Sequence, residues 1–185
     1  MQKEIMIAGF GGQGVLFAGQ VLAYAAMDSG KEVTWIPSYG PEMRGGTANC
    51  TVVIADEEIG SPNVEFPPAT IALNLPSYDK YEQLTQKGGV LVVNASMVDR
   101  GAKRDDITTV FIRANEIAEE IGDKRLMNMV TIGALLAFLP EIPLEAVEEA
   151  LKVHLPARHQ KLLPSNYQAL RRGYEEAKKQ VAVAA

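Results

Sequence analysis

The sequence predicts an α/β fold, a three-layer Rossmann-like arrangement in which helices flank a mostly parallel sheet. A short apolar run, residues 4–8, stops at a glycine cluster, as a buried strand of a parallel sheet does. An Ala- and Leu-rich helical segment and a second short strand follow, which is the opening of a doubly wound domain. The length of 185 residues suits one domain, so we expect a single domain over residues 1–185.

The first half of the chain alternates strands with helices. Pro37 is expected to stop the second strand, because the residues around a proline leave regular structure. Ser77, next to Pro76, is the expected cap of the second helix. We expect strands over residues 4–8, 32–36, 49–55 and 69–75, and helices over 15–27 and 76–86.

The second half ends in helices. Leu144, Val147 and Leu151 share one side of an amphipathic helix, and a helical C-terminal part is expected over about 143–180. We expect strands over residues 90–94 and 107–113, helices over 114–121, 127–138, 144–153 and 167–179, and a frayed end over 181–185.

The composition excludes several classes of protein. Hydrophobic residues make up 47% and charged residues 22%, close to the globular average, which excludes wholesale disorder. No run approaches the roughly 18 apolar residues of a membrane span. No cationic segment precedes an apolar stretch with a small-residue cleavage site, so no secretory signal is visible. We expect a cytoplasmic protein with no membrane partner.

Cysteine and histidine usage argues against a metal on this chain. Cys50 is the single cysteine, whereas an iron–sulfur cluster normally takes four protein ligands. His154 and His159 are five residues apart, but Pro156 lies between them and would break a shared helical face. We therefore expect no metal site here and place any redox metal on a partner.

Charge is unevenly distributed along the chain. Residues 1–149 hold 11 Lys and Arg against 21 Asp and Glu, whereas residues 150–185 hold 7 against 2. The acidic body would repel phosphates, and no aromatic–basic interleaving appears, so nucleic acid is not an expected partner. The basic end is interpreted as a solvated helix face or as a helix that docks on an acidic partner.

A glycine loop follows the first strand. Its pattern is G-x-G-x-x-G, and in this context the backbone can approach a phosphate at the N-terminus of the next helix. A dinucleotide site also needs an acidic residue at the end of the second strand, and the segment 35–38 has none. Anion contact and close helix–sheet packing both remain open. The candidate binding residues are Gly9, Gly11, Gly12, Gln13 and Gly14.

A second loop, residues 38–46, is more specific. Large functional side chains alternate there with Gly and Pro, and loops after the strands of an open α/β sheet lie at the edge where ligands bind. Arg44 suits a charge-assisted contact to a phosphate or carboxylate. The alternative interpretation is an ordered turn that caps strand ends. The candidate binding residues are Ser38, Tyr39, Gly40, Glu42, Met43, Arg44 and Gly45.

No self-contained catalytic set is visible. The chain has neither a G-x-S-x-G elbow nor a G-x-x-x-x-G-K-[ST] loop. Cys50 lies inside an expected strand, where a small hydrophobic residue is a better interpretation than a nucleophile. We therefore name no catalytic residue.

The two loops together, 7–14 and 38–48, closely resemble the gamma subunit of 2-oxoacid:ferredoxin oxidoreductases. Asn128-Met129-Val130, leading to Gly133-Ala134, resembles a later helix of that family. The resemblance extends to about Leu155, and its more specific part is the second loop. Ferredoxin-type cysteine runs, which gamma–delta fusions would add, are absent from this sequence.

The resemblance implies a complex that decarboxylates a 2-oxoacid oxidatively, transfers the acyl group to coenzyme A and reduces ferredoxin. The complex would use thiamine diphosphate, Mg, iron–sulfur clusters and coenzyme A, none of them held by this chain alone. Alpha and beta subunits, with or without a delta subunit, would be the partners. In such complexes the gamma subunit helps to shape the region of the cofactor and coenzyme A.

Two alternatives stay open at this point. One is a free-standing nucleotide-binding or interaction module that uses the glycine loop alone. The other is the related small subunit of indolepyruvate oxidoreductase. The sequence does not name the 2-oxoacid, and general resemblance favours 2-oxoglutarate over 2-oxoisovalerate or pyruvate. A surface that normally meets alpha and beta could drive homodimer formation of the isolated chain.

Overall fold

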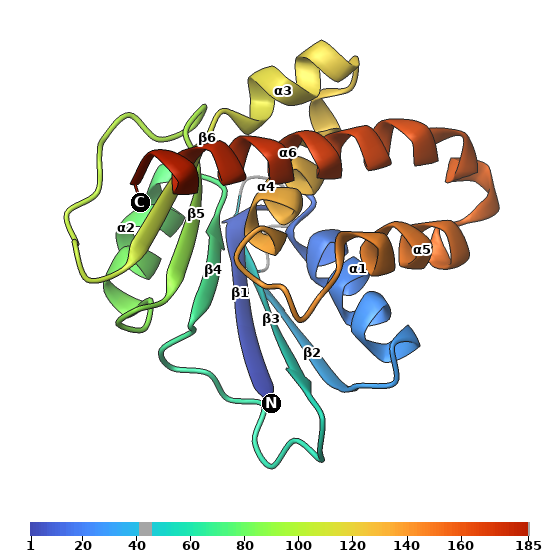
Figure 1. The fold of residues 1–185 in the computed structure, drawn as a ribbon, viewed down its shortest axis with the longest axis horizontal. Coiled ribbons are helices and arrows are strands. Elements are labelled where there is room, and N and C mark those ends of the chain that lie inside the picture. The colour runs from blue at the N-terminus through green and yellow to red at the C-terminus, as the bar shows by residue number, and fades with distance from the viewer. Residues whose placement is uncertain (41–45, 185) are drawn as a thin grey trace.

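One six-stranded sheet organises the molecule. The computed structural model describes residues 1–40 and 46–184, with side chains as far as residue 180. The strand order is β2-β3-β1-β4-β5-β6 (Figure 1). β3 is antiparallel to β1 and β2, and β1, β4, β5 and β6 are parallel to one another, which confirms a mostly parallel sheet. The strands are β1 (Gln2–Phe10), β2 (Glu32–Tyr39), β3 (Thr47–Ala55), β4 (Ala69–Ala72), β5 (Val90–Asn94) and β6 (Thr108–Ile112).

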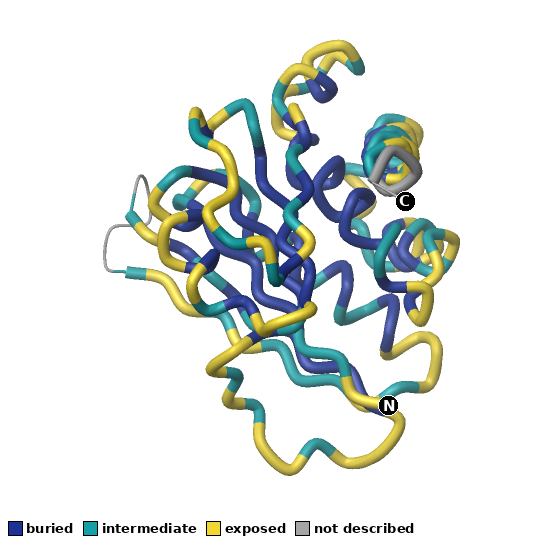
Figure 2. Tube along the Cα trace, turned by 60° about the vertical axis from the view of Figure 1, so that its left-hand side comes forward, coloured by how far each residue is buried: buried dark blue, intermediate teal, exposed yellow. Residues whose placement is uncertain are grey.

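The helices cover the two faces of the sheet unequally. The larger apolar core lies between one face and the helices α1 (Val15–Asp28), α3 (Ala114–Ile121), α4 (Met127–Leu136), α5 (Leu144–His154) and α6 (Leu163–Ala184). A smaller core on the other face lies under α2 (Leu75–Leu84) and the connection 95–107. Short 3-10 helices, η1 (Lys124–Leu126) and η2 (Ala157–Leu162), precede α4 and α6. The buried residues concentrate along the strands and the inner helices (Figure 2), which confirms three layers.

Helix α4 is buried along its whole length because it lies between the sheet and α6, which approaches it very closely. Two glycines make the crossing. A Cβ at Gly133 would overlap the carbonyl oxygen of Leu170, and a Cβ at Gly173 would overlap the carbonyl oxygen of Val130. Only glycine permits this approach of two helix backbones, so the Gly133 segment belongs to the packing of the fold.

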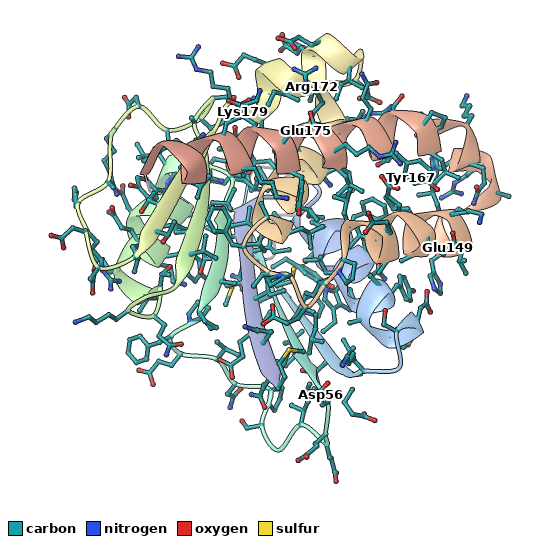
Figure 3. The ribbon with its side chains drawn as sticks, in the orientation of Figure 1. Asp56, Glu149, Tyr167, Arg172, Glu175 and Lys179 are labelled. Atoms are coloured by element: carbon teal, nitrogen blue, oxygen red, sulfur yellow. The ribbon has the colours of Figure 1, made fainter. Side chains whose placement is uncertain are left out.

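The basic C-terminal helix docks on acidic residues of its own chain. Arg171 Nε lies 2.7 Å from Glu148 Oε1, and Arg172 Nη2 lies 2.7 Å from Glu120 Oε2. Figure 3 shows Arg172 on the side of α6 that faces α3, and Tyr167 between α6 and α5. Two basic residues of this C-terminal part therefore pair with acidic residues of the same chain.

The connection 95–107 replaces a crossover helix and is held by a buried carboxylate. Glu82 is 2% exposed and accepts hydrogen bonds from Arg100 Nη2 (2.9 Å), Tyr78 Oη (3.0 Å) and the Lys103 N–H (2.7 Å). Burial would raise the pKa of Glu82, but these hydrogen bonds outweigh it and lower the pKa. The Arg100 guanidinium also lies 3.9 Å from the centroid of the Tyr78 ring.

Several expectations about element ends were wrong. β2 continues through Pro37 to Tyr39, because β2 is an edge strand and a proline can sit where no N–H partner is needed. Asn74, not Ser77, caps α2: its side chain accepts from the Ser77 N–H at 3.0 Å, which ends β4 early. α6 begins at Leu163 because Pro164 lies in its first turn, and it continues to Ala184, where fraying was expected.

No helix in the described ranges is both long enough and apolar enough to cross a bilayer.

Candidate functional site

The glycine loop turns tightly between β1 and α1. Gly12 and Gly14 have φ values of 97° and 74°, in the left-handed region that favours glycine. Gly14 is the N-cap of α1 and offers no side-chain acceptor, and the first turn of α1 carries no acidic residue. The first N–H groups of α1 therefore lack a side-chain partner, which is a favourable environment for an anion.

Gln13 closes this loop from inside. Its Oε1 accepts hydrogen bonds from the Phe10 N–H at 2.7 Å and from Asn74 Nδ2 at 3.0 Å. Its Nε2 donates to the carbonyl oxygen of Leu73 at 3.3 Å. The sequence analysis names Gln13 as a candidate binding residue. In the structure its side-chain amide instead forms hydrogen bonds that join the ends of β1 and β4.

Further asparagines extend this arrangement along the carboxyl edge of the sheet. Asn94 is fully buried at the end of β5, and its Nδ2 donates to Leu73 O at 3.4 Å and to Asn115 Oδ1 at 3.0 Å. The Asn115 N–H donates in turn to Ser96 Oγ at 3.0 Å, and Ser96 Oγ donates to Glu116. Sequence reasoning missed these residues. The signal that could have found the asparagines is an Asn that ends each of two short apolar runs, 71–74 and 90–94.

The later helix meets the glycine loop at its start. Asn128, at the beginning of α4, donates from Nδ2 to the Gly14 carbonyl oxygen at 3.2 Å, and it is 5% exposed. A Cβ on Gly14 would overlap this Asn128 amide. Two segments that the sequence analysis singled out, 114 residues apart, are thus in direct contact.

The second loop adjoins the first. Ser38 and Tyr39 were expected in a loop, but they end strand β2, where both are exposed. Gly40 donates its N–H to the Thr47 carbonyl oxygen at 3.3 Å, and the Gly46 carbonyl oxygen accepts from the Gly11 N–H at 2.9 Å. The remaining residues of this prediction, Glu42, Met43, Arg44 and Gly45, lie outside the described residues, as does Pro41.

The described residues include neither a reactive thiol nor a cluster of metal-binding side chains. Cys50 is buried in β3, and burial raises the pKa of its thiol to about 12. A thiol held neutral in this way is neither a nucleophile nor a cluster ligand. Among the described residues no three His, Cys, Asp or Glu side chains gather as a metal site would require. His154 instead lies 2.8 Å from Asp28 and stacks on Tyr24.

Comparison with known proteins identifies similar chains along almost the whole length. Residues 4–176 match the family described as pyruvate ferredoxin/flavodoxin oxidoreductase. The 2-oxoglutarate synthase subunit KorC of Methanocaldococcus jannaschii is 38% identical over 181 residues, covering 96% of this chain and 95% of that protein. The gamma subunit of a keto/oxoacid ferredoxin oxidoreductase from Geobacter sulfurreducens has a TM-score of 0.81 at 31% identity, covering 96% of this chain and 99% of that one.

Other relatives carry different substrate names. The ketoisovalerate oxidoreductase subunit VorA of Methanothermobacter marburgensis is 35% identical over 96% of this chain, but this chain spans only 37% of its length. Further relatives are named a pyruvate synthase subunit and an indolepyruvate oxidoreductase subunit. The similarity therefore extends across several 2-oxoacid substrates.

Proposed function

Because the chain belongs to the pyruvate ferredoxin/flavodoxin oxidoreductase family, we propose that it works as the gamma subunit of a multisubunit 2-oxoacid:ferredoxin oxidoreductase. The complex would decarboxylate a 2-oxoacid oxidatively, form the acyl-coenzyme A and reduce ferredoxin. The observation that carries the proposal is the similarity to KorC, in which both chains are covered almost completely. We treat residues 1–185 as one domain that acts within the complex and not alone.

The residues of this chain suit some of the cofactors of such a complex and not others. A buried thiol with a raised pKa does not suit an iron–sulfur cluster, and the described side chains gather no carboxylate site for Mg. We therefore place the clusters and Mg on alpha, beta or delta subunits. The uncapped N-terminus of α1 and the exposed Gly12 suit a phosphate group, which thiamine diphosphate and coenzyme A both carry.

The proposed role of this chain is to bind and orient the phosphorylated groups. Thiamine diphosphate, when bound, supplies the electron sink for decarboxylation. The backbone N–H groups around Gly12 and Gly14 would face a phosphate, and Gln13 would hold them in place. We also propose that Ser38, Tyr39 and Gly40 contact the phosphorylated group, and the prediction for Glu42, Met43, Arg44 and Gly45 stays a proposal.

We propose 2-oxoglutarate as the substrate, with succinyl-coenzyme A as the product. The support is that KorC relatives match this chain over nearly their whole length, at 38% identity in Methanocaldococcus jannaschii. The names of other relatives point to 2-oxoisovalerate, pyruvate or indolepyruvate, so the substrate has to be decided by assay. The proposed location is the cytoplasm, where ferredoxin would receive the electrons through the complex.

Affinity purification from the native host under anaerobic conditions tests the assembly. A tag on this chain should recover companion subunits that carry thiamine diphosphate and iron–sulfur clusters, identified by mass spectrometry and iron content. Recovery of this chain alone, with a tightly bound nucleotide, would instead support a free-standing nucleotide-binding module and contradict the proposal.

Substitutions in the assembled complex test the site. Arg44→Ala should lower turnover at least tenfold while the subunit stays incorporated, because a charge-assisted contact to an anion is lost. Arg172→Ala is the matched control, since Arg172 pairs with Glu120 on the surface of α6 and α3 and is expected to leave turnover unchanged. Wild-type turnover of the Arg44→Ala complex would remove Arg44 from the site.

A further inference from the structure

A groove of about 610 Å³ lies beside α1, and residues of η1, α5 and η2 complete its lining. It runs along α1 from Gly14 to Tyr24, which is about 15 Å at the rise of an α-helix. Its volume lies in the range of small-molecule sites. The proposal for this groove does not depend on the reaction of the complex.

The floor of the groove is apolar. Phe17 on α1 and Leu162 on η2 line it, and both side chains are only half-buried. Part of their apolar surface is therefore exposed to the groove. A ligand with an apolar body would remove this surface from water, which is favourable by roughly 25 cal/mol per Å². The aliphatic and aromatic lining comprises Phe17, Val21, Leu126, Leu151, Leu155 and Leu162.

The charges at the rim leave one cation without a carboxylate partner. Arg125 and Asp123 form a two-pronged ion pair, with Arg125 Nη2 2.6 Å and Nε 2.9 Å from the carboxylate oxygens, so their charges cancel. Arg158 donates from Nε to the ring Nε2 of His159 at 3.1 Å, and no ion pair joins it to a carboxylate in the described part of the chain. The lining therefore presents an apolar floor, the uncapped α1 N-terminus at Gly12 and Gly14, and one side-chain cation, Arg158, that no described carboxylate pairs with.

The wall that carries Arg158 is held in place before any ligand arrives. Gln160 Nε2 donates to the Leu155 carbonyl oxygen at 2.7 Å and to the Lys152 carbonyl oxygen at 3.1 Å, which joins η2 to the end of α5. Asn166 is 5% exposed and donates to the Leu162 carbonyl oxygen at 2.7 Å. A wall with a fixed backbone loses little conformational entropy on binding.

The same C-terminal end of α5 is also fixed to α1. The Tyr24 and His154 rings stack at a centroid distance of 4.0 Å and an angle of 6°. His154 Nε2 lies 2.8 Å from Asp28 Oδ2, so the ring cannot turn away from the groove without losing this contact. The wall formed by α5 and η2 is thus positioned against α1 by contacts that do not involve a ligand.

We propose that this groove binds an amphiphilic monoanion, a carboxylate with an aliphatic or aromatic body. The body would lie along Phe17 and its apolar neighbours, and the carboxylate would contact the Arg158 guanidinium. One side-chain cation without a carboxylate partner matches one negative charge. Such a ligand would lie against the helix that carries the glycine loop, so its binding reaches the candidate site directly.

Titration calorimetry of the full chain with hexanoate, octanoate and decanoate, each below its micelle concentration, tests the proposal. Affinity should rise about fourfold per added methylene. Each acid should bind roughly tenfold more tightly than the alcohol of the same length, because only the acid accepts a charge-assisted hydrogen bond. An absence of binding at millimolar concentrations, or equal affinities of acid and alcohol, would overturn the proposal.

Three variants separate the contribution of the carboxylate from the contribution of the apolar body. Arg158→Gln should abolish the preference for acid over alcohol and keep the increment per methylene. Gln20→Trp, at a half-exposed position on α1 that faces the groove, should fill it and abolish binding of both. Lys178→Gln removes a cation from α6, outside the groove, and should change neither affinity.

The variants also keep the test decisive. Circular dichroism spectra identical to that of the wild type would show that Arg158→Gln and Gln20→Trp are folded. An unchanged acid preference in Arg158→Gln, or undiminished binding in Gln20→Trp, would place the ligand elsewhere and refute the site.

Discussion

Replacing Gln13 by Ala should destabilise the protein far more than a half-exposed loop glutamine normally does. The substitution removes three hydrogen bonds at once, those with the Phe10 N–H, Asn74 Nδ2 and the Leu73 carbonyl oxygen. Each such bond contributes about 1 kcal/mol net. We therefore expect the free energy of unfolding to fall by about 3 kcal/mol, measured by urea unfolding with linear extrapolation.

Two further variants show whether the geometry of the amide is the cause. Gln13→Glu keeps the acceptor for Phe10 and Asn74 but loses the donor to Leu73, so its loss should be about 1–2 kcal/mol. Gln168→Ala, at an exposed position on α6, is the matched control and should stay within about 0.5 kcal/mol of the wild type.

The local consequence is separately measurable. In the wild type the Phe10 N–H should exchange slowly with solvent, and in Gln13→Ala it should exchange much faster, because it loses its acceptor. A Gln13→Ala protein with wild-type stability and a protected Phe10 N–H would refute the argument that Gln13 closes the glycine loop.

Other regions give predictions of the same kind. Gly133→Ala and Gly173→Ala should each lower the free energy of unfolding by about 2 kcal/mol or more, because the new Cβ overlaps backbone atoms of the facing helix. This is the opposite of the usual effect of Gly→Ala in a helix. Gly101→Ala, whose Cβ would meet open space, is the control and should be nearly neutral in the same urea experiment. Glu82→Gln should cost about 1–2 kcal/mol at pH 7, because charge-assisted hydrogen bonds from Arg100 and the Lys103 N–H are weakened while Arg100 keeps its ion pair with Asp79. Hydrogen bonds lower the folded-state pKa of Glu82, so its stabilisation is present above the usual glutamate pKa and is lost as the pH falls. The difference in the free energy of unfolding between wild type and Glu82→Gln should therefore shrink from pH 7 to pH 3. A constant difference would contradict this cause. Cys50 should not react with iodoacetamide at pH 8 in the native protein, because burial raises the pKa of its thiol to about 12. It should react once urea unfolds the chain. Rapid alkylation of the native protein, detected by mass spectrometry, would contradict the buried position.

Much of the fold was predictable because the apolar pattern dictates it. The helix expected over 114–121 is found at Ala114–Ile121, and the strand expected over 90–94 is found at Val90–Asn94. The errors arise where tertiary context overrides a local rule. Pro37 is tolerated because β2 is an edge strand, a position that local sequence does not reveal.

The candidate site was predictable as a pair of loops but not as a network. The G-x-G-x-x-G pattern and its context identify the turn before α1, and the structure adds that the Gly11 N–H contacts Gly46 across the two loops. That Gln13 turns inward could not be read from the sequence, because its partners Leu73 and Asn74 lie 60 and 61 residues away. The contact between Asn128 and Gly14 was hidden for the same reason.

Turnover measured with and without this chain tests the central claim most directly. The complex purified anaerobically would be assayed for viologen reduction that depends on both a 2-oxoacid and coenzyme A, with 2-oxoglutarate, 2-oxoisovalerate, pyruvate and indolepyruvate compared. We predict that a complex that lacks this chain has lost the activity, that adding the chain restores it, and that 2-oxoglutarate gives the highest kcat/KM. Full activity without this chain would contradict its role as a subunit, and a higher kcat/KM with another 2-oxoacid would reassign the substrate.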